Sequence, residues 1–230
     1  MGFWSYVIAK EPNRFPIAYN NRGLAFQTMG QFGRAIQDYT TAITLNPVEY
    51  LAYRSRGIAY YEMGQLDRAI EDFTAAIMLR PTRADLYASR GLVFEAMGQF
   101  DNAMEDLNKA ITLDPSSVDA YLNRGVTFEH MNQLDRAVED YDKTITLNPS
   151  DFLAYTNRGI AFNKMGRVEK AIEDFDKALS LNPSFVKAYI ERGDLYQKLG
   201  KTELAMRDNQ KACSLGSEEG CEALRTYGKQ

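Results

Sequence analysis

The sequence is poor in the residues that most enzymes use for chemistry. Its 230 residues include one histidine, His130, together with two cysteines and one tryptophan. No metal-ligand spacing surrounds the histidine, and no nucleophile–base motif or phosphate-binding glycine loop occurs. We therefore expect a protein that is not an enzyme and needs no cofactor or metal, and we expect His130 to face solvent.

An excess of one charge and long apolar runs are also missing. Lys and Arg number 27 against 31 Asp and Glu, which leaves a net charge of −4. This balance gives no electrostatic basis for binding nucleic acid or an anionic membrane. No apolar run approaches the roughly 20 residues of a membrane-spanning helix, so we expect no membrane insertion. The start of the chain does not look like a signal peptide, which makes a cytoplasmic location the default. Residues 7–13 look like the end of a repeat, so a longer parent chain stays open.

What the sequence does contain is one pattern that returns every 34 residues. Three residue types keep this step: Gly23, Gly57, Gly91, Gly125, Gly159 and Gly193; Ala35, Ala69, Ala103, Ala137, Ala171 and Ala205; Pro47, Pro81, Pro115, Pro149 and Pro183. Such a period indicates stacked helical units. We assign six units, preceded by a partial repeat or N-terminal cap at 1–15 and followed by a capping helix and tail at 217–230. The units are 16–49, 50–83, 84–117, 118–151, 152–185 and 186–219.

Each unit is typical of two helices joined by a tight turn. In the third unit, apolar residues recur at helical spacing along residues 83–98 and 99–115. A glycine that can adopt positive φ stands between the two helices at Gly30 and its equivalents, and Asn132 replaces it in the fourth unit. A proline follows the second helix and stops it. The sequence therefore predicts an all-α fold.

This pattern resembles the tetratricopeptide repeat (TPR) family. The first unit carries it at Tyr19, Arg22–Gly23, Phe26, Ala35, Tyr39 and Pro47. The resemblance implies a right-handed α-solenoid whose first helices line a concave groove, with a protein or peptide as partner. It says little about which partner, because one fold serves many functions.

The chain departs from the family pattern by placing an arginine before each repeated glycine. An aspartate recurs in the second helix, and Arg22 and Asp38 are equidistant from the turn at Gly30. We expect structural ion pairs within the hairpins: Arg22–Asp38, Arg56–Asp72, Arg90–Asp106, Arg124–Asp140, Arg158–Asp174 and Arg192–Asp208. The alternative is an arginine row that binds an acidic ligand.

The resemblance also implies which residues face the groove. The candidate peptide-binding residues are Asn20, Asn21, Leu24, Arg54, Ser55, Ile58, Tyr61, Ser89, Leu92, Glu95, Leu122, Asn123, Val126, Glu129, Asn157, Ile160 and Lys164. The row from Asn21 to Asn157 is similar to the asparagine ladder of O-GlcNAc transferase, which would bind a peptide backbone; filling space near the turn is the alternative. Leu24 cannot donate a hydrogen bond, so we expect no carboxylate clamp of the co-chaperone type.

Charge varies along this predicted groove. Its middle is acidic, its C-terminal end is basic, and Arg54 stands alone near the start. An extended peptide with a basic centre and an apolar anchor would complement this pattern, and a solvated mixed-charge face is the alternative. The charged residues concerned are Asp85, Glu95, Asp119 and Glu129, then Lys164, Lys187 and Lys198.

Cys213 and Cys221 lie near the ends of the last predicted helices. Their spacing resembles the disulfide-stapled hairpins of cysteine-rich helical-repeat proteins, which implies a disulfide and an exported or periplasmic location. Two reduced cysteines packed at the cap are the alternative. At the other end, residues 3–8 either cap the stack or dock a second copy. We predict an adaptor, with a self-assembling scaffold and the recruitment arm of a larger enzyme as the alternatives.

Overall fold

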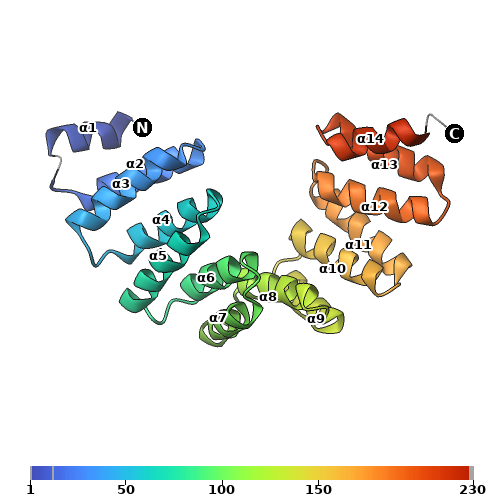
Figure 1. Ribbon diagram of the computed structural model, residues 1–230, viewed down its shortest axis with the longest axis horizontal. Helices are drawn as coiled ribbons and strands as arrows, with labels where there is room; N and C mark the ends of the chain where they lie inside the picture. Colours follow the sequence, from blue (N-terminus) through green and yellow to red (C-terminus); the bar gives the residue numbers. More distant parts are fainter. Residues whose placement is uncertain (1, 12, 228–230) are drawn as a thin grey trace. The chain divides into compact units, whose positions relative to one another are not determined.

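The structure is a computed structural model that describes residues 2–11 and 13–227, and these residues form helices and turns without a strand. The all-α prediction is confirmed. Residues 1, 12 and 228–230 lie outside the described part. The predicted segments 1–15 and 217–230 are therefore described only in part. Figure 1 shows the helices in chain order. They are α1 (Gly2–Lys10), α2 (Pro16–Thr28), α3 (Phe32–Leu45), α4 (Tyr50–Glu62), α5 (Leu66–Leu79), α6 (Ala84–Ala96), α7 (Phe100–Leu113), α8 (Val118–His130), α9 (Leu134–Leu147), α10 (Phe152–Lys164), α11 (Val168–Leu181), α12 (Val186–Lys198), α13 (Thr202–Ser214) and α14 (Glu218–Tyr227).

The turn inside each hairpin uses the left-handed backbone that the sequence predicts. Gly30 has φ of 69°, and its N–H donates to the Gln27 carbonyl while the N–H of Gln31 reaches back to the Phe26 carbonyl. These bonds satisfy carbonyls at the end of the first helix. Asn132 adopts φ of 57° at the same place in the fourth hairpin. Asparagine is tolerated there because its short side chain costs little in this region.

The chain divides into two compact units, Met1–Asn123 and Arg124–Gln230. In the first unit each first helix packs on its own second helix, and each second helix packs on the next first helix. Figure 1 shows α2, α4 and α6 following one another in this way, with α1 lying against α2. A cluster of Phe26, Ala35, Tyr39 and Ala59 joins three of these helices. The core is therefore a chain of local clusters between neighbouring helices.

The second unit repeats this packing in α10–α11 and α12–α13, and α14 covers α13. Phe175 fills the space above Gly159, where a Cβ would lie 2.8 Å from the ring. In the last hairpin Asn209 takes the place of that aromatic residue, with 1% exposure and no hydrogen-bond partner for its Nδ2. A disulfide joins Cys213 of α13 to Cys221 of α14, and their Cα atoms lie 4.7 Å apart.

The repeated glycine admits a bulky side chain from the second helix of its own hairpin. A Cβ on Gly23 would lie 2.6 Å from the Tyr39 ring, and one on Gly91 would lie 2.9 Å from Leu107 Cγ. Real side chains do not approach so closely, so any larger residue would push the two helices apart. The residue before this glycine, always arginine, then lies beside the same second helix.

All six arginines meet the aspartate that sequence spacing pairs with them. In the third hairpin, Arg90 Nε donates to Asp106 Oδ2 at 2.7 Å and Nη2 donates to Oδ1 at 2.9 Å. The other five pairs have the same two-bond geometry. Asp106 is 4% exposed, and its hydrogen bond raises the pKa of Arg90. The repeated arginines thus point into the hairpins, where their guanidinium groups are paired with aspartates.

Further bonds run to the second helix of the preceding hairpin from Arg56, Arg90, Arg158 and Arg192. Arg56 Nη1 donates to Thr40 Oγ1 at 3.0 Å, and Arg90 Nη1 donates to Thr74 Oγ1 at 2.9 Å. In the second unit the acceptors are carboxylates: Arg158 bonds to Asp142, and Arg192 bonds to Asp176. One guanidinium therefore links two successive hairpins as well as two helices of one hairpin.

Candidate functional site

The exposed side of the first helices carries the candidate site. Along α2, residues three or four apart share one stripe of the helix, and the same holds on α4 and α6. We call the first helix of each hairpin its A helix and name this surface of the first unit the A-helix face. It is defined as Ile17, Asn20, Leu24, Leu51, Arg54, Ile58, Asp85, Leu92 and Glu95. Two observations place the stripes side by side. Asn20 and Leu51 line one cavity, and Arg54 Nε lies 3.3 Å from Asp85 Oδ2.

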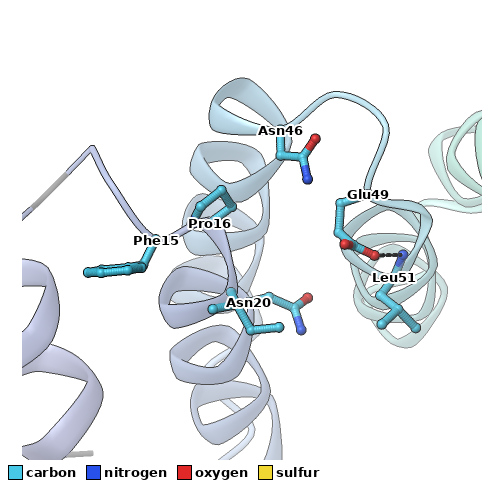
Figure 2. A pocket seen from close by; sticks show the side chains of 7 residues that line it. Phe15, Pro16, Asn20, Asn46, Glu49 and Leu51 are labelled. Atoms are coloured by element: carbon cyan, nitrogen blue, oxygen red, sulfur yellow. Dashed lines mark hydrogen bonds between the residues drawn. The ribbon is translucent and has the colours of Figure 1, made fainter.

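A cavity of about 160 Å³ opens where α2 and α4 begin (Figure 2). It is lined by Phe15, Pro16, Ile17, Asn20, Asn46, Glu49 and Leu51. Figure 2 shows the Asn20 amide directed from α2 toward the start of α4, where Glu49 and Leu51 lie. The rim is apolar and open to solvent, because Ile17 is 51% exposed, Phe15 38% and Leu51 37%.

The polar groups of this cavity are poorly used by the protein itself. Asn20 is 5% exposed, and its buried Oδ1 has no hydrogen-bond partner. Glu49 precedes α4 as its N-cap and accepts from the Leu51 N–H at a long 3.4 Å. An unpaired buried oxygen costs folding free energy of about 1–3 kcal/mol. A ligand that donates a hydrogen bond here would remove that cost.

Asn46 contributes a second underused amide. In two later connections the equivalent asparagine, Asn148 or Asn182, accepts from the N–H and hydroxyl of the serine two residues on. Val48 stands in the serine's place after Asn46 and has no hydroxyl to donate. The side chain of Asn46 is left to face the cavity instead (Figure 2).

Several of the charges predicted for the groove are paired inside the protein. Asp85 pairs with Arg54 and also with Arg83, whose Nε lies 2.9 Å from Asp85 Oδ1. In the second unit Glu129 accepts from Lys164 Nζ at 2.7 Å and from the Tyr141 hydroxyl at 3.0 Å. At Asp85 and Glu129 the negative charge is thus balanced by a cation of a neighbouring helix.

The row three residues before each repeated glycine is mostly buried. Asn20 is 5% exposed, Ala88 4%, Thr156 0% and Ile190 9%. Ile160, from the row one residue after the glycine, is also buried at 8%, while Leu24 is 41% exposed. The remaining candidates of both units are half-buried, apart from buried Ser55 and exposed Lys164: Asn21, Arg54, Ile58, Tyr61, Ser89, Leu92, Glu95, Leu122, Asn123, Val126, Glu129 and Asn157.

Two rungs of the predicted amide-and-hydroxyl ladder serve the protein's own structure. Ser55 is 6% exposed. The Ser89 hydroxyl donates to the Asp85 carbonyl one turn earlier in α6, at 2.8 Å. Hydroxyls in helices often bond in this way to their own backbone. A peptide would therefore not meet a continuous row of free rungs in the first unit.

The second unit holds one carboxyl group in an unusual setting. Glu191 of α12 is half-buried, and burial raises its pKa above the ordinary value. The negative charges of Asp194, Glu129 and Glu219 raise it further, while Lys187 acts in the opposite direction. A positive charge brought to this place would stabilise the ionised carboxylate.

Metal chemistry and membrane insertion find no support among the described residues. Nowhere in them do three or more His, Cys, Asp or Glu side chains gather as metal ligands would. None of the described helices combines the length and apolar character needed to cross a bilayer. His130 is exposed at the end of α8.

Comparison with known families agrees with the repeat pattern. The sequence matches the tetratricopeptide repeat over residues 16–47, 118–151 and 152–185, with further TPR matches over 57–98, 96–132 and 175–207. The chain belongs to the TPR family. No curated protein matches the sequence.

Solved TPR structures share the fold at low sequence identity. The Cut9–Hcn1 assembly of the APC/C matches with a TM-score of 0.86 at 16% identity, over 96% of this chain and 44% of that one. A TPR protein from Parabacteroides merdae matches with 0.80 at 22% identity, over 96% and 88%. YrrB, described as having an unusual peptide-binding site, matches with 0.58 at 23% identity, over 80% and 95%. The chain thus spans less than half of the Cut9–Hcn1 chain.

Sequence reasoning missed two features of this TPR protein. The cavity draws Phe15, Asn46 and Glu49 from connections that the 34-residue pattern treats as spacers. The signal was Val48, which lacks the hydroxyl that serine donates to the asparagine elsewhere. The links between hairpins were missed as well, although their acceptors Thr40, Thr74, Asp142 and Asp176 also keep the 34-residue step.

Proposed function

We propose that this TPR protein is a non-enzymatic scaffold that binds an extended segment of a partner protein on the A-helix face. The family and the peptide-binding site named for YrrB support a protein or peptide as ligand. The observation that carries the proposal is the open cavity between α2 and α4, whose rim exposes Ile17 and Leu51. Exposed apolar side chains around a concave, partly polar site are typical of binding surfaces.

The carboxylate at the cavity favours a segment that carries positive charge. Glu49 contributes the ionisable side chain of the cavity lining. Complementary charge speeds encounter and excludes wrong partners more than it adds affinity. Apolar anchors would then supply most of the binding free energy.

The test is affinity capture from extract of the source cells with a groove variant and a matched control. Leu24→Glu/Leu51→Glu places charge on the A-helix face, at side chains that are 41% and 37% exposed. Met78→Glu on the second helix α5 is the control, because Met78 is 79% exposed. We expect a partner that the wild type and Met78→Glu both retain and that the double variant loses. Equal capture by all three proteins would contradict the proposal.

Self-assembly is the second candidate, and helix α1 is the observation that favours it. Phe3 is 68% exposed and Tyr6 58%, on helix α1, which packs on α2. Uncovered apolar ends of repeat arrays promote stacking. A mass that rises with concentration, measured by light scattering, and that returns to the monomer in Phe3→Glu/Tyr6→Glu would favour this role.

A further inference from the structure

We propose that the cavity between α2 and α4 binds the side chain of one lysine in the partner segment. This inference rests on the proposed function, and it names the chemistry that the A-helix face recognises. Pockets that enclose a drug-sized ligand measure roughly 300–1,000 Å³. At about 160 Å³ this cavity is smaller and suits a single side chain.

The walls and the polar groups match the two parts of a lysine side chain. Phe15, Ile17 and Leu51 form an apolar rim against which an alkyl stem can pack. Behind them lie three groups that can accept hydrogen bonds: the carboxylate of Glu49 and the side-chain amides of Asn20 and Asn46. Glu49 is the charged member of the lining, so the cavity is negative. An ammonium has three donors and no acceptor, which complements this set.

The Asn20 amide is the part of the cavity that most needs a ligand. Its buried Oδ1 makes no hydrogen bond, so the present orientation of the amide gains nothing from that atom. Figure 2 shows the amide directed toward the start of α4, and its last side-chain bond has a broad, roughly two-fold energy profile, so the oxygen can turn to meet a donor in the cavity. There it can accept from an ammonium, and the unpaired oxygen becomes a binding group.

Lysine is favoured over arginine by the state of the Glu49 carboxylate. Glu49 Oε1 already accepts from the Leu51 N–H, as the dashed line in Figure 2 shows. A guanidinium binds best when both carboxylate oxygens face its planar fork. With one oxygen partly used by this long bond, a compact ammonium, which needs no paired oxygens, suits the other oxygen and the two amides.

The combination of an asparagine at the Asn20 position with a glutamate at the Glu49 position does not recur at the other hairpins of the described chain. Positions equivalent to Asn20 hold Arg54, Ala88, Leu122, Thr156 and Ile190. The Thr156 hydroxyl already donates to the Phe152 carbonyl at 2.8 Å. Asp151, which stands where Glu49 does, accepts from the Ala154 N–H at 3.0 Å. The chain therefore shows that apolar residues are tolerated at the Asn20 position.

The experiment is a nuclear magnetic resonance titration of the full chain with Nα-acetyl-L-lysine methylamide. We expect saturable shifts at the starts of α2 and α4, including the Asn20 side-chain amide. The norleucine analogue, which lacks the ammonium, and the Nε-acetylated probe should bind roughly tenfold more weakly, as the loss of a charge-assisted hydrogen bond implies. Equal binding of the norleucine probe would overturn the proposal. Tighter binding of the arginine analogue, or of leucine methylamide with its free α-amine, would overturn it too.

Two variants separate ligand binding from folding. Asn20→Leu should lose the lysine-specific shifts and raise the melting temperature, because an unpaired buried oxygen is replaced by an apolar group. Glu49→Gln should weaken binding of the lysine probe roughly tenfold, while Glu62→Gln, at the other end of α4, should leave it unchanged. A lower melting temperature for Asn20→Leu with unchanged binding would assign Asn20 to structure and overturn the proposal. If the lysine probe fails and Leu24→Glu/Leu51→Glu still loses its partner, the proposed function stands without this inference.

Discussion

At the scale of single residues, the guanidinium of a repeated arginine makes several interactions at once. Arg56 donates two bonds to Asp72 of its own hairpin and one to Thr40 of the hairpin before it. It also lies between the rings of Tyr53 and Tyr60, each 5.9 Å away. Arginine rather than lysine suits this place, because only its planar fork can pair with a carboxylate and reach a third acceptor.

The pair of Arg90 and Asp106 provides a test of this role. Asp106 is 4% exposed and the Arg90 side chain 20%, so either partner left alone would be a buried or half-buried charge without its counter-ion. We expect Arg90→Leu and Asp106→Leu each to lower the free energy of unfolding by about 3–5 kcal/mol. The double variant should cost less than the sum, and less than Arg90→Leu alone, because it removes both charges. Urea denaturation followed by circular dichroism measures all three.

The control for this cycle is Arg68→Leu. Arg68 is exposed on α5 and donates to Gln65, so its loss should change stability by no more than about 0.5 kcal/mol. Additive costs for Arg90→Leu and Asp106→Leu would show that the two side chains do not act as a pair.

At the scale of helices, the sequence predicts the elements well because their signals are local. Glycine or Asn132 marks each inner turn, and the observed α6 and α7 lie inside the predicted ranges 83–98 and 99–115. The Arg–Asp geometry follows from equal distances to that turn. The cavity did not follow, since it depends on how a connection such as Asn46–Glu49 folds against the next hairpin.

The 34-residue period alone also could not predict how deeply individual side chains are buried. Ser55 and Asn123 occupy equivalent positions, yet Ser55 is buried and Asn123 half-buried. The difference arises from which side chains the neighbouring hairpin offers, and these vary from unit to unit. A pattern of spacings predicts the direction of a side chain better than its exposure.

Helix α12 supplies a prediction about pH. Burial raises the pKa of Glu191, with Asp194, Glu129 and Glu219 adding to the effect and Lys187 opposing it. The fold therefore favours the neutral carboxyl group. Its contribution to stability is complete below the ordinary pKa and is lost as pH rises through the raised pKa. We expect Glu191→Gln to be more stable than wild type at pH 7.

The advantage of Glu191→Gln should shrink as the pH falls, because wild-type Glu191 then becomes neutral as well. Melting temperatures of both proteins between pH 4 and pH 8 measure this, with exposed Glu222→Gln on α14 as the control. A constant difference across the range would mean that glutamine acts through packing and not through charge.

At the scale of the whole molecule, the two compact units link their hairpins with different chemistry. In Met1–Asn123 the arginines reach the hydroxyls of Thr40 and Thr74. In Arg124–Gln230 they reach the carboxylates of Asp142 and Asp176. Neighbouring repeats of a solenoid are coupled through such interfaces. The acceptor of this arginine link is therefore a carboxylate in the second unit and a neutral hydroxyl in the first, where Arg54–Asp85 is a further ion pair between hairpins.

Salt should weaken the second unit more than the first. The Asp142 side chain is 54% exposed and that of Asp176 53%, so their ion pairs are open to screening. We expect 1 M salt, against about 0.05 M, to reduce the free energy of opening in α9–α13 by several tenths of a kcal/mol per pair, within the range for exposed pairs. Hydrogen exchange with mass spectrometry resolves α3–α7 from α9–α13 in one sample.

Both units lie in one chain and bury apolar surface of the same kind. The general effect of salt on the burial of apolar surface is therefore the same in both units and cancels when they are compared. The matched variant is Asp142→Thr, which gives the second unit the hydroxyl acceptor that Thr74 provides to Arg90. It should lose part of the salt dependence in α9 and α10 while leaving α3–α7 unchanged. If wild type responds to salt equally in both units, or if Asp142→Thr keeps the full response, the carboxylates do not couple the hairpins. The arginines would then act through their own hairpins alone.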